Sequence, residues 1–132
     1  MGVAAVADIV FDCARPARLA RFWAAALDDY EVAPYDNEEL ARLRSIGITD
    51  IEDDPTVLVE PGNGRGPRLW FQLVPEAKLV KNRVHLDLRA DDVDAEVDRL
   101  IRLGARELHE QRNDGLVVLQ DPEGNEFCLL RP

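Results

Sequence analysis

The stretch RVHLDLRADDVDAEVDRLIRLGA, residues 83–105, decides the fold. Polar and apolar residues alternate through 83–89, as they do in a strand with one buried face. Asp91-Asp92 then caps a helix, and apolar residues recur at helical spacing from Val93 until Gly104 ends the pattern. We therefore expect a strand over 83–89 followed at once by a helix.

Three short segments follow this helix. They lie at residues 106–110, 116–120 and 126–130, and the turn sequence DPEGN precedes the last of them. We predict a short strand in each of them. The second half of the chain is therefore predicted to be a βαβββ module.

The first half repeats this order. An apolar run at 4–13 leads into a helix that begins at Pro16, and further strands are predicted at 30–34, 55–60 and 68–74. Residues 36–54 interrupt the repeat with a helical segment that ends in the acidic sequence Glu52-Asp53-Asp54, which we expect to be a solvated edge. The fold class is therefore α+β, with two tandem βαβββ modules.

The composition excludes several classes of partner. A chain of 132 residues suits one domain, and its net charge of -10 disfavours nucleic acid and membrane surfaces, which attract clustered Lys and Arg. The first residues lack a basic leader, so we expect a cytoplasmic protein. Cys13 and Cys128 form no closely spaced pair and are expected to be reduced thiols.

Three segments carry a family resemblance: DCARPARLARFWAAAL at 12–27, RLWFQLVPEAKLVKNRVHLDL at 68–88 and DPEGNEFCLL at 121–130. With the duplicated module, they resemble the vicinal oxygen chelate superfamily, in its glyoxalase-like, actinobacterial branch. The resemblance implies one glyoxalase-like domain over 1–132, with module 1 at about 1–78 and module 2 at about 79–132. It also implies a curved mixed sheet around a cup, and a homodimer.

In that superfamily the first and fourth strands of each module present metal ligands into the cup. Carried over, these positions are Asp8 and Gln72 in module 1 and His85 and Cys128 in module 2. The first pair is 64 residues apart and the second 43, and the difference is close to the length of the inserted segment 36–54.

Strand alternation extends this set of residues. One face of the strand at 83–89 carries Arg83, His85, Asp87 and Arg89, whereas the other carries Val84, Leu86 and Leu88 and should meet a helix. The predicted ligand pocket therefore comprises seven residues: Asp8, Trp70, Gln72, His85, Asp87, Glu126 and Cys128. Trp23 is expected in the core.

His85 is the catalytic candidate, because an imidazole moves protons near neutral pH. The alternative for His85 is a simple pairing with Asp87 or Glu126. For Cys128 the expectation is an inert thiol, since neighbouring carboxylates suppress the thiolate.

A conventional metal quartet is not expected. One carboxylate, one amide, one imidazole and one thiol suit neither a hard cation nor a thiolate-bound metal well. The expected cofactor is therefore none, with a divalent metal as the alternative.

Three functions stay open from the sequence. The first is the metal-free binding of a small organic molecule, with or without acid/base chemistry. The second is a metal-dependent lyase, isomerase or dioxygenase, and the third is a binding protein that sequesters a drug. We expect the inserted segment 36–54 to act as a lid over the ligand.

Overall fold

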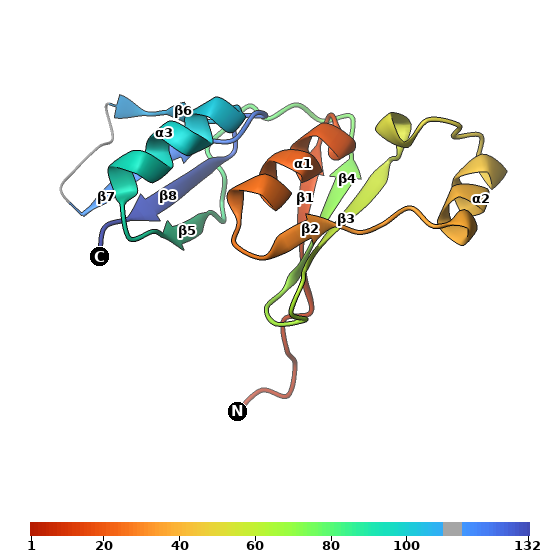
Figure 1. Cartoon of the computed structure of the whole chain (residues 1–132), viewed down its shortest axis with the longest axis horizontal. Coiled ribbons are helices and arrows are strands. Elements are labelled where there is room, and N and C mark those ends of the chain that lie inside the picture. The colour runs from red at the N-terminus through yellow and green to blue at the C-terminus, as the bar shows by residue number, and fades with distance from the viewer. Residues whose placement is uncertain (110–114) are drawn as a thin grey trace. The chain divides into compact units, whose positions relative to one another are not determined.

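The computed structural model describes residues 1–109 and 115–132, which divide into two compact units, Met1–Ala77 and Lys78–Pro132. Each unit carries a four-stranded mixed sheet and has the order βαβββ (Figure 1). The α+β class and the two tandem modules are therefore confirmed. Within the described residues, no helix has the length and apolar character needed to cross a bilayer.

The first unit contains β1 (Asp8–Cys13), α1 (Pro16–Ala26), β2 (Tyr30–Val32), β3 (Thr56–Pro61) and β4 (Arg68–Leu73). Its strands lie in the order β1-β4-β3-β2, and β1 runs parallel to β4 while the other neighbours are antiparallel. The connection through α1 and the β2–β3–β4 meander thus brings the first and last strands of the unit side by side, with β1 at one edge of the sheet.

Helix α1 covers one face of this sheet (Figure 1). Trp23 is 1% exposed and lies with its ring centroid 5.4 Å from that of Phe11, which in turn stacks on Phe71 at 5.0 Å. Such aromatic pairs add to the stabilisation that burial provides. Trp23 therefore belongs to the core, as predicted, and the opposite sheet face is left for other contacts.

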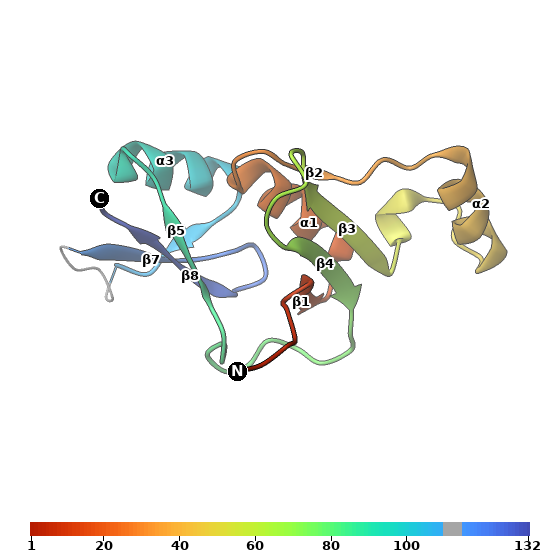
Figure 2. The ribbon, with the colours of Figure 1, turned by 90° about the horizontal axis from the view of Figure 1, so that it is seen from below.

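The second unit repeats the topology. It contains β5 (Leu86–Arg89), α3 (Val93–Leu103), β6 (Arg106–Glu107), β7 (Leu116–Gln120) and β8 (Glu126–Leu130), in the sheet order β5-β8-β7-β6. Helix α3 lies along one side of this sheet (Figure 2). Asp92 caps α3 by accepting a hydrogen bond from the backbone N–H of Ala95 at 3.1 Å, and Gly104 ends the helix with a φ of 120°.

Five predicted strands are longer than the observed ones; among them, β2 ends at Val32 instead of residue 34 and β4 at Leu73 instead of residue 74. β1 begins at Asp8, not at residue 4, and β6 ends at Glu107, although residue 110 of that prediction lies outside the described part of the chain. β5 begins at Leu86, so Val84 is 78% exposed and does not meet a helix as expected. β8, the strand that pairs with β5, itself begins at Glu126, so the ladder starts at Leu86 and Phe127, and the side chain of Glu126 binds the Asn82 N–H ahead of it.

The inserted segment folds as α2 (Asn37–Ser45) and the single 3-10 turn η1 (Ile51–Asp53), so its helical character is confirmed. Asp36 caps α2 by accepting from the N–H of Glu39 at 2.8 Å. The prediction of a solvated acidic edge is wrong for Asp54, which is 2% exposed. Its carboxylate accepts from the Tyr35 hydroxyl at 2.7 Å and from the Thr56 N–H at 3.0 Å, and these bonds make its burial tolerable.

Two turns of the first unit are joined through their backbones. The N–H of Gly62, at the tip between β3 and β4, donates to the carbonyl of Asp29 at 2.7 Å. Asp29 has a φ of 57°, in the left-handed region, and a Cβ added to Gly62 would lie 2.6 Å from Oδ1 of Asp29. The corner before β2 and the hairpin tip therefore fit each other only with glycine at position 62 or with a moved Asp29 side chain.

Candidate functional site

The sheet face of the first unit that α1 leaves uncovered carries a row of alternating residues from three strands. The register aligns Leu58 with Trp70 and Trp70 with Val10, and in the next row it aligns Thr56 with Gln72 and Gln72 with Asp12. Val57, Leu69 and Phe71 occupy the buried face. The uncovered face thus offers an aromatic ring, an aliphatic side chain and polar groups side by side.

Asp8 is engaged by Arg68, its neighbour on β4. The Asp8 carboxylate accepts from Nε of Arg68 at 2.8 Å and from Nη2 at 3.1 Å. This bond to Arg68, followed by the charge of Arg68 and a hydrogen bond from Trp70, lowers the pKa of Asp8 below 3.8 against the smaller opposing effect of burial. Asp8 therefore holds the guanidinium of Arg68, which in turn lies over the Trp70 ring.

Asp8 and Gln72 do not meet. Asp8 pairs with Arg68 in the register and Gln72 with Asp12, so four residues of strand separate them, which is roughly 13 Å at the usual rise per residue. The two residues that the resemblance places together in module 1 thus lie at opposite ends of the β1–β4 pair.

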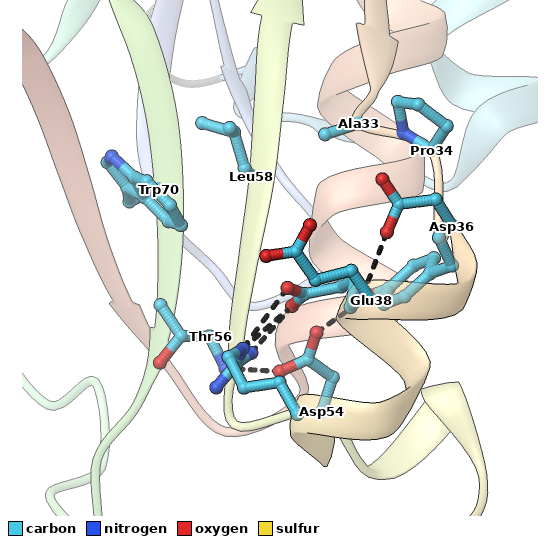
Figure 3. Close-up of a pocket in the computed structure, with 11 residues that line it drawn as sticks. Ala33, Pro34, Asp36, Glu38, Asp54, Thr56, Leu58 and Trp70 are labelled. Carbon is cyan, nitrogen blue, oxygen red and sulfur yellow. Dashed lines mark hydrogen bonds and ion pairs between the residues drawn. The ribbon is translucent and has the colours of Figure 1, made fainter.

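A cavity of about 700 Å³ lies against this uncovered face. Thr56, Leu58 and Trp70 line it from the sheet, and the inserted segment lines it from the other side (Figure 3). The inserted segment and the three residues before it contribute eight lining residues: Ala33, Pro34, Tyr35, Asp36, Glu38, Glu39, Arg42 and Asp54. Of the seven predicted pocket residues, Trp70 lines this cavity.

Sequence reasoning expected the inserted segment to cover a ligand, but it did not identify which side chains of the segment line this cavity. The residues of the segment that line the cavity are mostly charged, and such a composition is typical of a solvent-exposed helix. Asp54 directly precedes Pro55 and a strand, and this local pattern gives no sign that Tyr35, 19 residues earlier, hydrogen-bonds to it. Only the fold of the whole segment brings these side chains together.

In the second unit, His85, Asp87 and Cys128 form a cluster. One ligand atom from each lies within 4.8 Å of the others, and Nε2 of His85 is 3.3 Å from Oδ1 of Asp87. His85 and Asp87 share a face two residues apart, while Cys128 lies opposite Asp87 in the parallel register. The structure thus brings together three of the seven predicted pocket residues.

Cys128 is 8% exposed. Burial, and then the charge of Asp87 and a hydrogen bond to it, raise the pKa of the Cys128 thiol above 9.0. At neutral pH the thiol is therefore protonated, and it is a poor nucleophile.

Glu126 does not join this cluster. Its carboxylate accepts from Nζ of Lys78 at 2.9 Å and from the Asn82 N–H at 3.0 Å, and its side chain is 11% exposed. Burial alone would raise the pKa of Glu126, but the hydrogen bonds from Asn82 and Lys78 outweigh burial and lower it below 4.5. Glu126 holds the segment that leads into β5.

Comparisons with known proteins agree with this architecture. A family model described as a glyoxalase-like domain matches residues 8–130. No curated protein matches the chain. Solved structures of the same fold are similar at low sequence identity.

One similar structure is a glyoxalase/bleomycin resistance protein/dioxygenase family enzyme from Burkholderia phytofirmans. It is 16% identical with a TM-score of 0.66, over 97% of this chain and 98% of that one. Another is the fosfomycin resistance protein FosX from Listeria monocytogenes, 9% identical with a TM-score of 0.64, over 99% and 93% of the two chains. A mutant of that FosX has been solved with Mn(II) and 1S,2S-dihydroxypropylphosphonic acid, at 10% identity and a TM-score of 0.62, over 98% and 90% of the two chains.

Proposed function

The chain belongs to the glyoxalase-like domain family, and on that premise we propose that it binds a small organic molecule in the cavity of its first unit. The observation that carries the proposal is the cavity of about 700 Å³ between the uncovered sheet face and the inserted segment. Cavities of this size, with apolar walls and a few polar groups, are typical of small-molecule sites.

The walls of the cavity suit an organic ligand. Trp70 and Leu58 lie side by side in the sheet and give it an apolar floor, while Thr56 adds a hydroxyl at one end. The guanidinium of Arg68 lies over the indole ring of Trp70, 5.7 Å from the ring centroid, and the ring offers a surface for stacking. Fixed walls reduce the entropy lost on binding.

The inserted segment is the second wall. Leu43 is the buried residue of α2, and the Tyr35–Asp54 hydrogen bond ties the approach of α2 to the start of β3. We propose that this segment closes over the ligand, as a lid would. This binding does not require a metal, since the lining residues supply both apolar surface and charge.

Tryptophan fluorescence tests this proposal directly. The chain has two tryptophans: Trp23 in the core and Trp70 at the cavity. In a screen of small organic molecules, we expect ligands that bind to alter the emission of Trp70 in chelator-treated protein, and Trp70→Phe to abolish the response while Trp23 still reports the folded state.

A blocking substitution completes the test. Leu58→Arg fills the cavity and should abolish binding that calorimetry detects in the natural protein. Leu73→Arg is the matched control, because Leu73 is an exposed residue of the neighbouring strand that does not line the cavity. Equal binding by both variants would place the ligand elsewhere and refute the proposal.

The cluster of His85, Asp87 and Cys128 favours a second candidate, a metal-dependent function. An imidazole, a carboxylate and a thiol are all zinc ligands, and three protein ligands leave a position open for a substrate. The set fits zinc better than manganese or magnesium, which prefer oxygen ligands. A metal there would act as a Lewis acid on an oxygen atom of the substrate.

Cobalt substitutes for zinc and reports its ligands, so it tests the second candidate. If Cys128 binds the metal, Co²⁺ added to the protein should produce a sulfur-to-cobalt charge-transfer absorption. Cys128→Ser should remove this absorption and His85→Ala should weaken cobalt binding. Absence of the absorption, with Cys13→Ser as the control background, would rule out a metal at this cluster.

A further inference from the structure

The cavity of the first unit places one aromatic ring and one uncommitted carboxylate on facing walls. Trp70 lies on the sheet side, and Figure 3 shows the Glu38 carboxylate directed from α2 into the cavity. Resting on the proposed function, we infer that the ligand of this cavity carries an organic ammonium group next to an apolar body.

The other charged groups of the cavity already have partners. Arg42 donates through Nε to both oxygens of Glu39 at 3.1 Å and through Nη2 to Oε1 at 2.6 Å, so these two charges neutralise each other. Asp36 is used in capping α2, and Asp54 is held by Tyr35 and a backbone N–H. These bonds fix the carboxylates of Asp36 and Asp54, neither of which forms an ion pair within the described residues, although the charge of Asp54 also interacts with Arg42.

Glu38 differs from its neighbours. Among residues 1–109 and 115–132, no side chain forms a hydrogen bond or ion pair with it, although it lines the cavity. Its charge adds to those of Asp36 and Asp54, so the one guanidinium of the lining faces four carboxylates in all. The surplus of negative charge attracts a cation and repels an anion.

Trp70 favours the same class of ligand. A cation near the face of an indole ring is attracted by the electron density of the ring. The guanidinium of Arg68 already lies over this ring, with its central carbon 5.7 Å from the ring centroid. Leu58 beside Trp70 offers the apolar contact that the uncharged part of such a molecule needs.

Three probes of nearly the same size separate charge from shape: 2-phenylethylamine, which is a cation at neutral pH, neutral 2-phenylethanol and anionic phenylacetate. Dissociation constants would be measured from Trp70 fluorescence, with Trp70→Phe as the blank. We expect the amine to bind about tenfold more tightly than the alcohol and phenylacetate to bind most weakly.

Glu38→Gln tests the carboxylate that we assign to cation recognition. The variant should lose most of the preference for the amine while the affinity for the alcohol stays the same. Glu31→Gln is the matched control, because Glu31 is an exposed residue of β2 that does not line the cavity, and its loss changes the net charge equally. The preference should survive in that control.

The outcomes separate the two proposals. If the alcohol binds as tightly as the amine, or if Glu38→Gln leaves the preference unchanged, the inference of a cationic ligand is overturned while the cavity is still a binding site. If none of the three probes changes Trp70 fluorescence or gives heat in calorimetry, both the inference and the proposed binding site are overturned.

Discussion

Asp8 and Arg68 are joined across the parallel strands β1 and β4 by two hydrogen bonds, at 2.8 and 3.1 Å. The pair lies at the edge of the face that carries Trp70, and its guanidinium lies over the indole ring. Asp8, which was expected to face a ligand directly, thus does not line the cavity; it binds Arg68, and Arg68 lies over Trp70 in the cavity wall.

The Asp8–Arg68 pair predicts the titration of one carboxyl group. Because Arg68 lowers the pKa of Asp8 below 3.8, Arg68→Gln should raise the titration midpoint of Asp8, as followed by NMR of its side-chain carbon. A lowered folded-state pKa means that the pair stabilises the fold above the unfolded-state pKa and that this contribution is lost as the pH falls through the folded-state value. Arg42→Gln should leave Asp8 unchanged, and a shift of Asp8 in that control would contradict the assignment.

The buried carboxylate of Asp54 predicts unequal effects of two tyrosine substitutions. Tyr35→Phe removes a hydrogen bond to a charged, buried group and should cost about 1.5–3 kcal/mol of unfolding free energy. Tyr30→Phe removes a bond of 2.8 Å to the carbonyl of Pro67 and should cost only about 0.5–1.5 kcal/mol. Urea denaturation of the two variants measures both values, and equal losses would show that Asp54 does not depend on Tyr35.

The environment of Cys128 predicts that its thiol reacts slowly with disulfide reagents. Burial and the Asp87 carboxylate raise its pKa above 9.0, so reaction with a disulfide reagent at mildly alkaline pH should be slow in a Cys13→Ser background. Asp87→Asn should speed the reaction about threefold or more, because the thiolate forms more readily. Asp91→Asn, at an exposed position of the same unit, serves as the control, and an equal rate in all three proteins would mean that Asp87 does not affect the thiol.

The ion pair between Glu126 and Lys78 predicts an acid-sensitive contribution to stability. The pKa of Glu126 is lowered below 4.5, so its contribution is complete above that value and disappears as the pH falls through the folded-state pKa. In Glu126→Gln the urea midpoint should fall less steeply below pH 4.5 than in the natural protein. Glu76→Gln, an exposed substitution in the other unit, should keep the natural slope; a Glu126→Gln slope as steep as that control would contradict the prediction.

The elements that local signals define were predictable. Asp92 and Gly104 bound α3, and Pro16 marks the first turn of α1, because capping and backbone restrictions act within a few residues. The start of β5 was not predictable from its own sequence, since its partner strand β8 begins only at Glu126, about 40 residues later in the chain. A strand ends where its partners end, and alternation alone does not reveal that.

The candidate site was likewise predictable only in part. Alternation placed His85 and Asp87 on one strand face, the family resemblance added Cys128 to the predicted pocket, and the β5–β8 register puts Cys128 beside Asp87. Alternation also predicted that Trp70 shares a face with Gln72. For the segment 36–54 the sequence predicted a lid but not which of its side chains line the cavity, because its contacts with the sheet are not local in the sequence.

The contact between Asp29 and Gly62 has an evolutionary consequence. The two loops are 33 residues apart in the sequence, yet the backbone bond and the close fit at Gly62 oblige each to accommodate changes in the other. Relatives that lengthen or recompose the hairpin tip should carry a compensating change at the corner. An engineer who transplants one of these loops into another scaffold must transplant both.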